Sequence, residues 1–257
     1  MNSSDVNCDV GEMPEMVADG RQAALLHYIS SANVACGGHA GNAEMMRATI
    51  EQAQAAGAAI GAHPGYEDRE HFGRSELALS HEEIADSVHR QILALCEIAN
   101  SCGARIEHVK PHGALYNQAA RDAKVARAIA DGVARWNTDV ILVGLAGSMM
   151  LTEFRSAKFR VATEAFADRR YEGDGSLRSR KFDDAMLQQP EEAAEQALSI
   201  VQKGCVRSAD GKIIPVPADT ICIHGDTPGA LQIARAIDEA FRAAGIIRKR
   251  LGLIELR

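Results

Sequence analysis

Side chains that could carry out acid–base or metal chemistry follow several short apolar segments of the chain. Asn7, Asp9 and Glu12 come at the end of the first segment, and His63 comes at the end of the third. The full set, in chain order, is Asn7, Asp9, Glu12, Asn33, His39, His63, Lys110, His112, Tyr116, Asn117, Glu164, Asp168, Arg169, His224 and Asp226. Reactive residue types at matching places on separate segments predict one shared site.

Two kinds of chemistry fit this set, and the residue types leave both open. Asp9, His39 and His63 offer the oxygen and nitrogen ligands of a divalent metal with an activated water. Either Glu12 or His112 would complete such a ligand set. Without a metal, the same carboxylates and imidazoles can act as general acids and bases.

Basic residues near two segment ends predict an anion site. Lys110 closes an apolar segment, where its ammonium could bind a carboxylate or phosphate, or stabilise an oxyanion. The alternative is a structural ion pair of Lys110 with Asp9 or Glu164. Residues 168–181 carry five basic side chains with two glycines between them, which suits a lid, a phosphate clamp or a solvated surface loop.

Apolar runs that alternate with amphipathic stretches must position these residues. The predicted strands are Asp5–Cys8, Ala32–Ala35, Ala58–Ala62, Ile106–Lys110, Val140–Gly144, Arg160–Ala165 and Thr220–His224. The predicted helices are Arg21–Ser30, Ala43–Ala56, His81–Cys102, Asp122–Trp136, Met149–Arg155, Pro190–Lys203 and Pro228–Ala244. This alternation predicts βα units and a parallel sheet. Because GxGxxG and GxxxxGK(S/T) fingerprints are absent, we expect an α/β fold of the distorted (β/α) barrel type with about seven parallel strands.

Composition and charge bound the class of protein. The 257 residues carry a net charge of −7, which argues against nucleic acid or an anionic membrane as the main partner. The six cysteines form no CxxC pair or zinc spacing, as in proteins of the reducing cytoplasm. Residues 1–10 lack signal-peptide features, and no apolar run is long enough to span a bilayer. We expect one cytoplasmic domain over residues 1–257, without a membrane partner.

Several segments of the chain resemble one known family. They are residues 7–12 (NCDVGE), 31–41 (SANVACGGHAG), 61–66 (GAHPGY), 72–74 (FGR), 109–117 (VKPHGALYN), 164–169 (EAFADR) and 224–226 (HGD). These motifs resemble those of the LamB/YcsF family, in the family's order and over nearly the whole chain.

The resemblance implies a fold, an activity and partners. The fold would be a distorted (β/α) barrel like that of the glycoside hydrolase/deacetylase group. The activity would be the ATP-dependent hydrolytic opening of the lactam 5-oxo-L-proline to L-glutamate, with Mg-ATP bound and with partner subunits B and C. A bound divalent metal is left open, with Asp9, His39 and His63 as its candidate ligands.

In this hypothesis the site residues have separate roles. Asp9 or Glu12 is the base, and Lys110 binds carboxylate or phosphate charge. The remaining catalytic candidates, which orient water or polarise the amide, are His39, His63 and His112. The candidates for binding the 5-oxoproline-like substrate or a phosphate are Asn7, Asn33, Tyr116, Asn117, Glu164, Asp168, Arg169, His224 and Asp226.

Two other functions stay open at this point. The first is a metal-dependent deacetylase or amidase that acts on a sugar or cyclic amide without ATP. The second is a non-catalytic binding protein, which the density of ionisable groups disfavours. The chain also departs from the family's usual pattern at Gly38, where Phe is common, and at Asn42-Ala43, where Asp-Pro is common. The missing ring at Gly38 predicts a larger or looser pocket.

Overall fold

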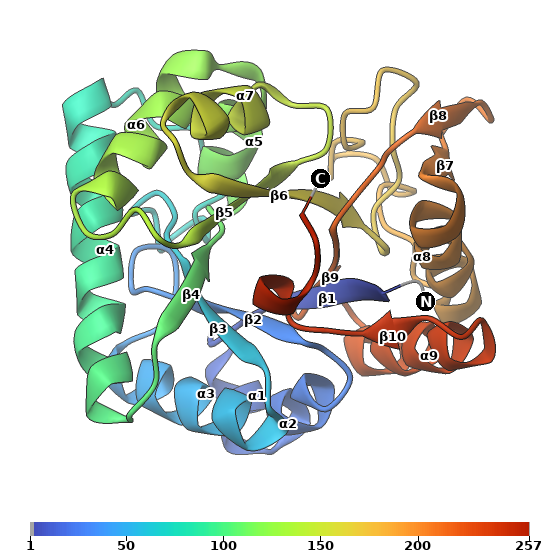
Figure 1. Cartoon of the computed structure of the whole chain (residues 1–257), viewed down its shortest axis with the longest axis horizontal. Coiled ribbons are helices and arrows are strands. Elements are labelled where there is room, and N and C mark those ends of the chain that lie inside the picture. Colours follow the sequence, from blue (N-terminus) through green and yellow to red (C-terminus); the bar gives the residue numbers. More distant parts are fainter. Residues whose placement is uncertain (1–2, 257) are drawn as a thin grey trace.

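The structure is a computed structural model, which describes residues 3–256. Within these residues seven parallel strands close into a barrel (Figure 1). Their order is β1 (Ser3–Val10), β2 (Ser31–Ala35), β3 (Ala59–His63), β4 (Ile106–Val109), β5 (Ile141–Leu145), β6 (Arg160–Phe166) and β9 (Thr220–His224). Strand β9 pairs with both β6 and β1, which closes the ring. The predicted α/β barrel is confirmed.

Helices surround the barrel, with α4 on one side and α8 and α9 on the other (Figure 1). Their bounds are α1 (Pro14–Ala18), α2 (Arg21–Leu26), α3 (Ala43–Ala56), α4 (His81–Ser101), α5 (Gly113–Arg121), α6 (Ala123–Ala134), α7 (Met149–Ser156), α8 (Pro190–Lys203) and α9 (Ala230–Ala243). Ser80 and Glu83 form a capping box at the start of α4, and Gly57 ends α3 with a φ of 72°. Within residues 3–256 no helix combines the length and apolarity needed to cross a bilayer.

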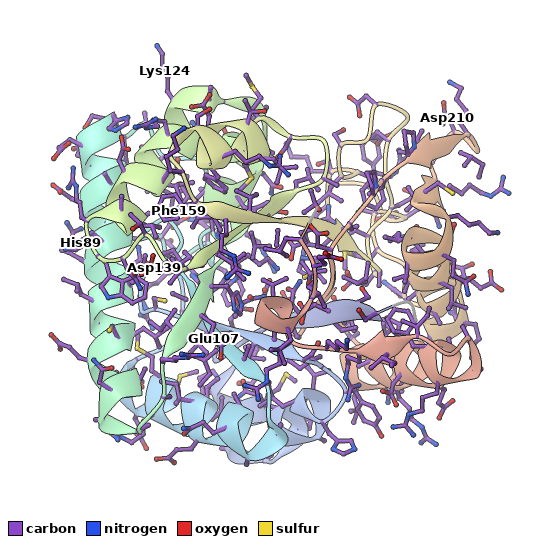
Figure 2. All side chains as sticks on the ribbon, in the orientation of Figure 1. His89, Glu107, Lys124, Asp139, Phe159 and Asp210 are labelled. Carbon is purple, nitrogen blue, oxygen red and sulfur yellow. The ribbon has the colours of Figure 1, made fainter. Side chains whose placement is uncertain are left out.

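Strand β1 presents an apolar face to the helices and a polar face to the interior. On β1, Val6 and Cys8 belong to the hydrophobic core, whereas Asn7 and Asp9 reach side chains of other strands inside the barrel. This follows from the two-residue period of a strand. Elsewhere charged side chains such as Lys124 and Asp210 project from the surface (Figure 2). The sequence thus places polar groups inside the ring of strands.

The C-terminal segment closes the amino end of the barrel. Leu251, in the short turn η1 (Leu251–Leu253), packs in a small apolar cluster with Ile141, Val143 and Ala162. Its backbone N–H donates to Ser31 Oγ at 3.4 Å. Because this end is plugged, the carboxyl end of the strands is the open one.

Several elements differ from the prediction. Helix α2 ends at Leu26 rather than Ser30, and α5 occupies a stretch expected to be a loop. Other unpredicted elements are α1, η1, the antiparallel pair β7 (Cys205–Arg207) and β8 (Ile213–Pro215), and β10 (Ile247–Arg248) beside β1. These are too short to show a repeating apolar pattern. The single domain over residues 1–257 stays a prediction, and residues 1, 2 and 257 lie outside the described part of the chain.

Candidate active site

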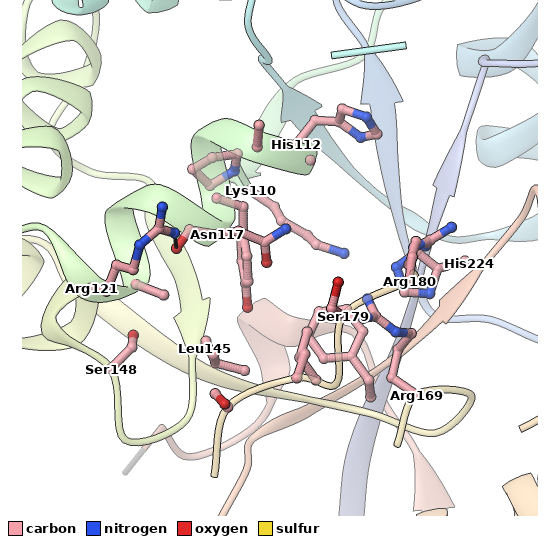
Figure 3. Close-up of a pocket in the computed structure, with 18 of the residues that line it drawn as sticks. Lys110, His112, Asn117, Arg121, Leu145, Ser148, Arg169, Ser179, Arg180 and His224 are labelled. Carbon is pink, nitrogen blue, oxygen red and sulfur yellow. Dashed lines mark hydrogen bonds between the residues drawn. The ribbon is translucent and has the colours of Figure 1, made fainter. Parts of the chain in front are cut away.

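The carboxyl ends of the strands surround a cavity of about 850 Å³. The predicted site residues that line it are Asp9, Glu12, His63, Lys110, His112, Tyr116, Asn117, Arg169, His224 and Asp226. The remaining predicted residues are buried behind this lining, namely Asn7, Asn33, His39, Glu164 and Asp168. Figure 3 shows Asn117, Arg121 and Ser148 on one side of the cavity and Arg169, Arg180 and His224 on the other.

Lys110 is buried between two carboxylates. Its Nζ lies 2.8 Å from Asp9 Oδ1 and 3.1 Å from Glu164 Oε1. It also stands 5.4 Å from the centre of the Phe166 ring. Burial opposes the charge, but the neighbouring acids, Asp9 first, outweigh burial and hold the pKa of Lys110 well above its usual value. Lys110 therefore forms the structural ion pair with both of its predicted partners.

Two of the predicted binding residues hold this ion pair in place. Asn33 Nδ2 donates to Asp9 Oδ1 at 2.8 Å and to Asn7 Oδ1 at 2.7 Å. Asn7 Nδ2 in turn donates to Glu164 Oε1 at 2.9 Å. His108 Nε2 also donates to Asn33 Oδ1, at 2.8 Å. The asparagines thereby fix Asp9, which lines the cavity, and Glu164, which is buried behind it.

Glu12, His39, His63 and His112 form a buried group, named here the acid–histidine cluster. One ligand-type atom of each lies within 4.8 Å of the others, so the cluster could hold a metal ion. Glu12 Oε1 is 2.9 Å from His39 Nε2 and 3.3 Å from His112 Nδ1. The rings of His39 and His112 stack with their centres 3.7 Å apart. Asp9, a predicted metal ligand, lies outside this group of four, with Oδ2 3.3 Å from His63 Nε2.

The hydrogen bonds of His63 and His112 require a proton or a cation between the two rings. Backbone carbonyls only accept, so His63 Nδ1 donates to the Lys110 carbonyl at 2.7 Å and His112 Nε2 donates to the Phe72 carbonyl at 2.9 Å. His63 Nε2 and His112 Nδ1 then face each other at 3.0 Å. Two lone pairs at that distance repel, so either a proton or a cation belongs between them.

The two carboxyl groups at the mouth differ in their protonation. Burial and then the charge of Asp9 raise the pKa of Glu12 well above its usual value, which favours the protonated form. Asp9 is equally buried, but the charges of His63 and Lys110 outweigh burial and hold its pKa well below its usual range. Carboxyl groups whose pKa values are pushed apart can serve as the acid and the base of one reaction.

His39 and His112 are neutral members of the cluster. Burial, followed by the charge of His63, lowers the pKa of His39 well below its usual value. Burial, followed by the charges of His39 and His63, lowers the pKa of His112 in the same way. Neutral rings can accept or pass on a proton held by Glu12.

On the β9 side of the cavity, Asp168 orients His224. His224 Nδ1 lies 3.0 Å from Asp168 Oδ1, and the backbone N–H of His224 donates to Asp168 Oδ2 at 3.0 Å. Although Asp168 is buried, the charge of His224 and its hydrogen bonds lower the pKa of that carboxyl. The ring of His224 stacks on Phe166, and its Nε2 has no hydrogen-bond partner in the described chain. His224 therefore presents Nε2 to a ligand.

The other predicted binding residues include two, Tyr116 and Asp226, that already form contacts within the chain. The Tyr116 hydroxyl donates to Glu164 Oε2 at 2.7 Å, which uses its proton inside the site. Asp226 forms an ion pair with Arg74 and lies 3.9 Å from Arg180. Asn117 points into the cavity (Figure 3). Arg180 also lines the cavity and belongs to the basic segment 168–181, for which a lid or phosphate clamp was one interpretation. Arg74 and Arg121 line the cavity as well, and the sequence reasoning gave neither an individual role.

The expected enlargement of the pocket at Gly38 is wrong, because Gln91 fills the space. A Cβ at Gly38 would lie 2.3 Å from Gln91 Oε1. That side chain, on α4, accepts from the Gly65 N–H at 3.1 Å and donates to the Gly65 carbonyl at 2.7 Å. A Cβ at Gly65 would meet His39 Nδ1 at 2.9 Å, so Gly65 packs directly against the cluster. No local pattern around Gln91 in the sequence signals this role.

Phe72 is a second positioning residue that sequence reasoning did not single out. Its φ of 57° is left-handed, a backbone conformation that is strained for a bulky residue. In this conformation its carbonyl accepts a hydrogen bond from the His112 Nε2–H. Its ring also packs edge-on against His39 and His112, with centres 5.7 and 5.5 Å away. Phe72 thereby fixes which nitrogen of His112 faces the cluster.

The fold and the site together define a (β/α)-barrel enzyme with carboxylates and imidazoles at the carboxyl end of its strands. Comparison with known proteins identifies the family. The chain belongs to the LamB/YcsF family, whose family model matches residues 4–254.

Two similar proteins illustrate this membership, and a third has a similar fold. A relative from Chloroflexus aurantiacus, named as the A subunit of 5-oxoprolinase, is 48% identical over 246 residues, which cover 96% of this chain and 97% of the relative. The crystal structure of a lactam utilization protein from Thermus thermophilus matches with a TM-score of 0.89 at 42% identity, over 96% of this chain and 99% of that one. A family 4 carbohydrate esterase from Streptomyces lividans, in complex with acetate, has a TM-score of 0.51 at 10% identity over 96% and 93% of the chains, and shares the fold alone.

Proposed function

We propose that this chain is the A subunit of a 5-oxoprolinase, which opens the lactam of 5-oxo-L-proline to L-glutamate in a reaction coupled to ATP hydrolysis. The names of its relatives support the proposal. The observation that carries it is that Asp9 and Glu12 both line the cavity, with the pKa of Glu12 shifted upward by burial and that of Asp9 shifted downward by the charges of His63 and Lys110. Opening a lactam requires a proton acceptor for water and a proton donor for the departing nitrogen.

The coupled reaction balances with two water molecules. The amide oxygen attacks the γ-phosphorus of ATP, and ADP leaves. The lactam is now an imidoyl phosphate, whose carbon is electrophilic. One water adds to this carbon and loses a proton to the base. The C–N bond then breaks, and the nitrogen takes up protons as it becomes the amine. The second water hydrolyses the resulting acyl phosphate to the carboxylate of glutamate and free phosphate.

We propose a role for each catalytic residue in this scheme. Asp9, which Lys110 keeps ionised, accepts the proton of the attacking water. Glu12 donates its proton to the departing nitrogen, and the hydrogen bond between Glu12 and His39 holds Glu12 in place. His63 and His112 share the proton between their facing nitrogens and return it to Glu12. His224 Nε2 accepts a hydrogen bond from the lactam N–H.

The phosphates of ATP have no P-loop in this chain, so other groups must receive them. Basic side chains that line the cavity are Arg74, Arg121, Arg169, Arg180 and Lys181. We propose that Mg-ATP, or a lactam already phosphorylated by partner subunits B and C, reaches the chain at this cavity. The free thiols of all six cysteines accord with a cytoplasmic location, which we also propose.

A second candidate function is a metal-dependent deacetylase or amidase that acts on a sugar or cyclic amide without ATP. It is favoured by the facing nitrogens of His63 and His112, since metal-bound histidines usually donate their other N–H to a carbonyl or carboxylate. The ligands would be Glu12, His39, His63 and His112. A divalent metal there would supply Lewis-acid polarisation of the scissile carbonyl.

One assay tests both candidates. Glutamate formation from 5-oxoproline is measured with and without ATP, with and without subunits B and C, and before and after dialysis against a chelator. The proposal predicts glutamate only when ATP and both partners are present. ATP-independent, chelator-sensitive amide hydrolysis by the isolated chain would support the second candidate. The absence of glutamate in the complete mixture would contradict the first.

A further inference from the structure

Arg169 is a buried arginine that forms no ion pair within residues 3–256. The residue is 6% exposed. One terminal nitrogen, Nη2, donates to the Arg178 carbonyl at 2.6 Å, while Nε is buried without any hydrogen-bond partner. Arginine is almost never buried unless its charge is paired. Arg169 lines the cavity. Its guanidinium therefore still needs an anion, and the described part of the chain does not supply one.

Arg178, on the same loop, shows how the chain treats a structural arginine. Its Nη1 lies 2.8 Å from Glu172 Oε1, and its Nε lies 2.7 Å from Asp184 Oδ1. Two carboxylates thus neutralise Arg178, although it is more exposed than Arg169. The loop also contains other acidic residues, but within the described residues none of them forms an ion pair with Arg169.

The backbone holds Arg169 in a fixed position. Gln196 Nε2, from α8, donates to the Arg169 carbonyl at 2.8 Å. The N–H of Leu187 donates to the Asp168 carbonyl at 2.9 Å, one residue earlier. A side chain anchored in this way is ordered before a ligand arrives, which lowers the entropy cost of binding.

Arg180 adds a second positive charge to the same side of the cavity (Figure 3). The carboxylate oxygen that it approaches, Asp226 Oδ2, is 3.9 Å away and is already held by Arg74. Burial, followed by the charge of Arg180, lowers the pKa of Arg169 to about 10, so Arg169 remains charged at neutral pH. Lys110, by contrast, is neutralised by Asp9 and cannot serve a ligand in the same way.

We propose that Arg169 and Arg180 form an oxyanion subsite for a phosphoryl group, on the side of the cavity that carries His224. A phosphoryl dianion offers two negative charges to the two guanidiniums, whereas a carboxylate carries a single charge. This inference rests on the proposed function, in which either ATP or a phosphorylated lactam brings the phosphoryl group. The lactam ring would then lie toward Asp9 and Glu12.

Binding to the full chain tests the subsite without any turnover. Inorganic phosphate, the non-hydrolysable ATP analogue AMP-PNP and acetate are each titrated calorimetrically into the wild type. Phosphate is expected to bind more tightly than acetate. AMP-PNP binding more tightly than phosphate would assign the phosphoryl group to a nucleotide, and AMP-PNP binding no better than phosphate would assign it to the substrate. Acetate binding as tightly as phosphate would overturn the assignment to a phosphoryl group.

Variants then locate the site. Arg169→Met keeps the side-chain volume and is expected to weaken phosphate binding by about tenfold or more, since charge-assisted hydrogen bonds are lost. Arg180→Met, in the loop, should weaken it less and guards against a folding defect at position 169. Arg207→Met is the matched control, because exposed Arg207 also donates to one backbone carbonyl, that of Gly211. Phosphate affinity unchanged in both Arg169→Met and Arg180→Met would overturn the subsite, even if the complex still forms glutamate.

Discussion

The two sides of the cavity differ in how their charges are satisfied. Around Lys110, two carboxylates balance one ammonium, and asparagines occupy the remaining carboxylate lone pairs. Around Arg169, a buried guanidinium has one carbonyl partner and a free Nε. The first side fixes protonation states through groups of the chain itself, and the second side leaves a charge for an arriving anion. Substitutions around Lys110 should therefore change the stability of the protein and the rate of the reaction. Substitutions on the side of Arg169 should change the affinity for the ligand.

The largest effect on activity is expected for Lys110→Met. Removing the ammonium leaves Asp9 and Glu164 buried without their counter-ion, which typically costs about 3–5 kcal/mol of stability. Glutamate formation by the complex should fall below detection, and the thermal midpoint of the isolated chain should drop. Lys212→Met, which removes an exposed partner of Asp210, should leave both unchanged. Wild-type stability of Lys110→Met would refute the contrast between the two sides.

A smaller effect is expected on the open side for His224→Gln. The variant loses the acceptor Nε2 that Asp168 orients, so kcat/KM for 5-oxoproline should fall by about tenfold, mainly through KM. Steady-state kinetics at varied 5-oxoproline measure the split. If kcat falls and KM does not change, His224 acts in the chemical step and its assignment to binding is wrong.

Gln91→Ala should have a still smaller effect on rate, since Gln91 acts through Gly65. Two backbone groups of Gly65 lose their partner, and the packing against His39 loosens. We expect kcat to fall a few-fold while the KM for 5-oxoproline stays the same, as kinetics of the complex would show. Exposed Gln54, which donates to the Cys102 carbonyl, provides the control Gln54→Ala. Equal effects of the two substitutions would show that Gln91 is not a positioning residue.

Asp5→Asn should leave the rate unchanged and alter only the pH dependence of stability. Burial raises the pKa of Asp5 from 3.8 to about 6 in the folded protein. A raised folded pKa contributes stability that is complete below about pH 4 and is lost as the pH rises through about 6. The stability of the wild type relative to Asp5→Asn should thus decrease by up to about 3 kcal/mol between pH 4 and pH 7. Urea unfolding at several pH values measures this difference, and a constant difference would contradict the raised pKa.

The sequence was sufficient to predict the barrel because its strands are regular. The prediction rested on short apolar runs that alternate with amphipathic helices, and β1, β6 and β9 lie where it placed strands, with reactive residues at their ends. Helix α5 was missed because Pro111 and Gly113 look like a turn, although helices tolerate such residues at their start. An ion pair of Lys110 with Asp9 or Glu164 was one of the alternatives that the sequence left open, but its pairing with both acids at once could not be predicted, since it depends on closure of the ring.

Positioning residues were harder to predict than reactive ones. Gln91 lies 26 residues from Gly65 on an ordinary amphipathic helix, and only tertiary packing brings the two together. The unusual backbone of Phe72 is likewise set by its surroundings and not by its residue type. The difference between Arg169 and Arg178 could not be read from the loop, because both are arginines among acids. Such distinctions depend on which acid a guanidinium reaches in space.

The acid–histidine cluster is proposed to open the lactam, and Glu12→Gln tests this role most directly. Glutamine keeps the shape and the hydrogen-bonding capacity of a protonated Glu12 but cannot release its proton. Glutamate formation by the complete complex with ATP should fall by at least about a hundredfold, with the thermal midpoint of the chain unchanged. Glu15→Gln, at an exposed position of α1, should behave as the wild type. A rate for Glu12→Gln within about twofold of the wild type, far from the hundredfold loss expected of a catalytic acid, would contradict this role of the cluster.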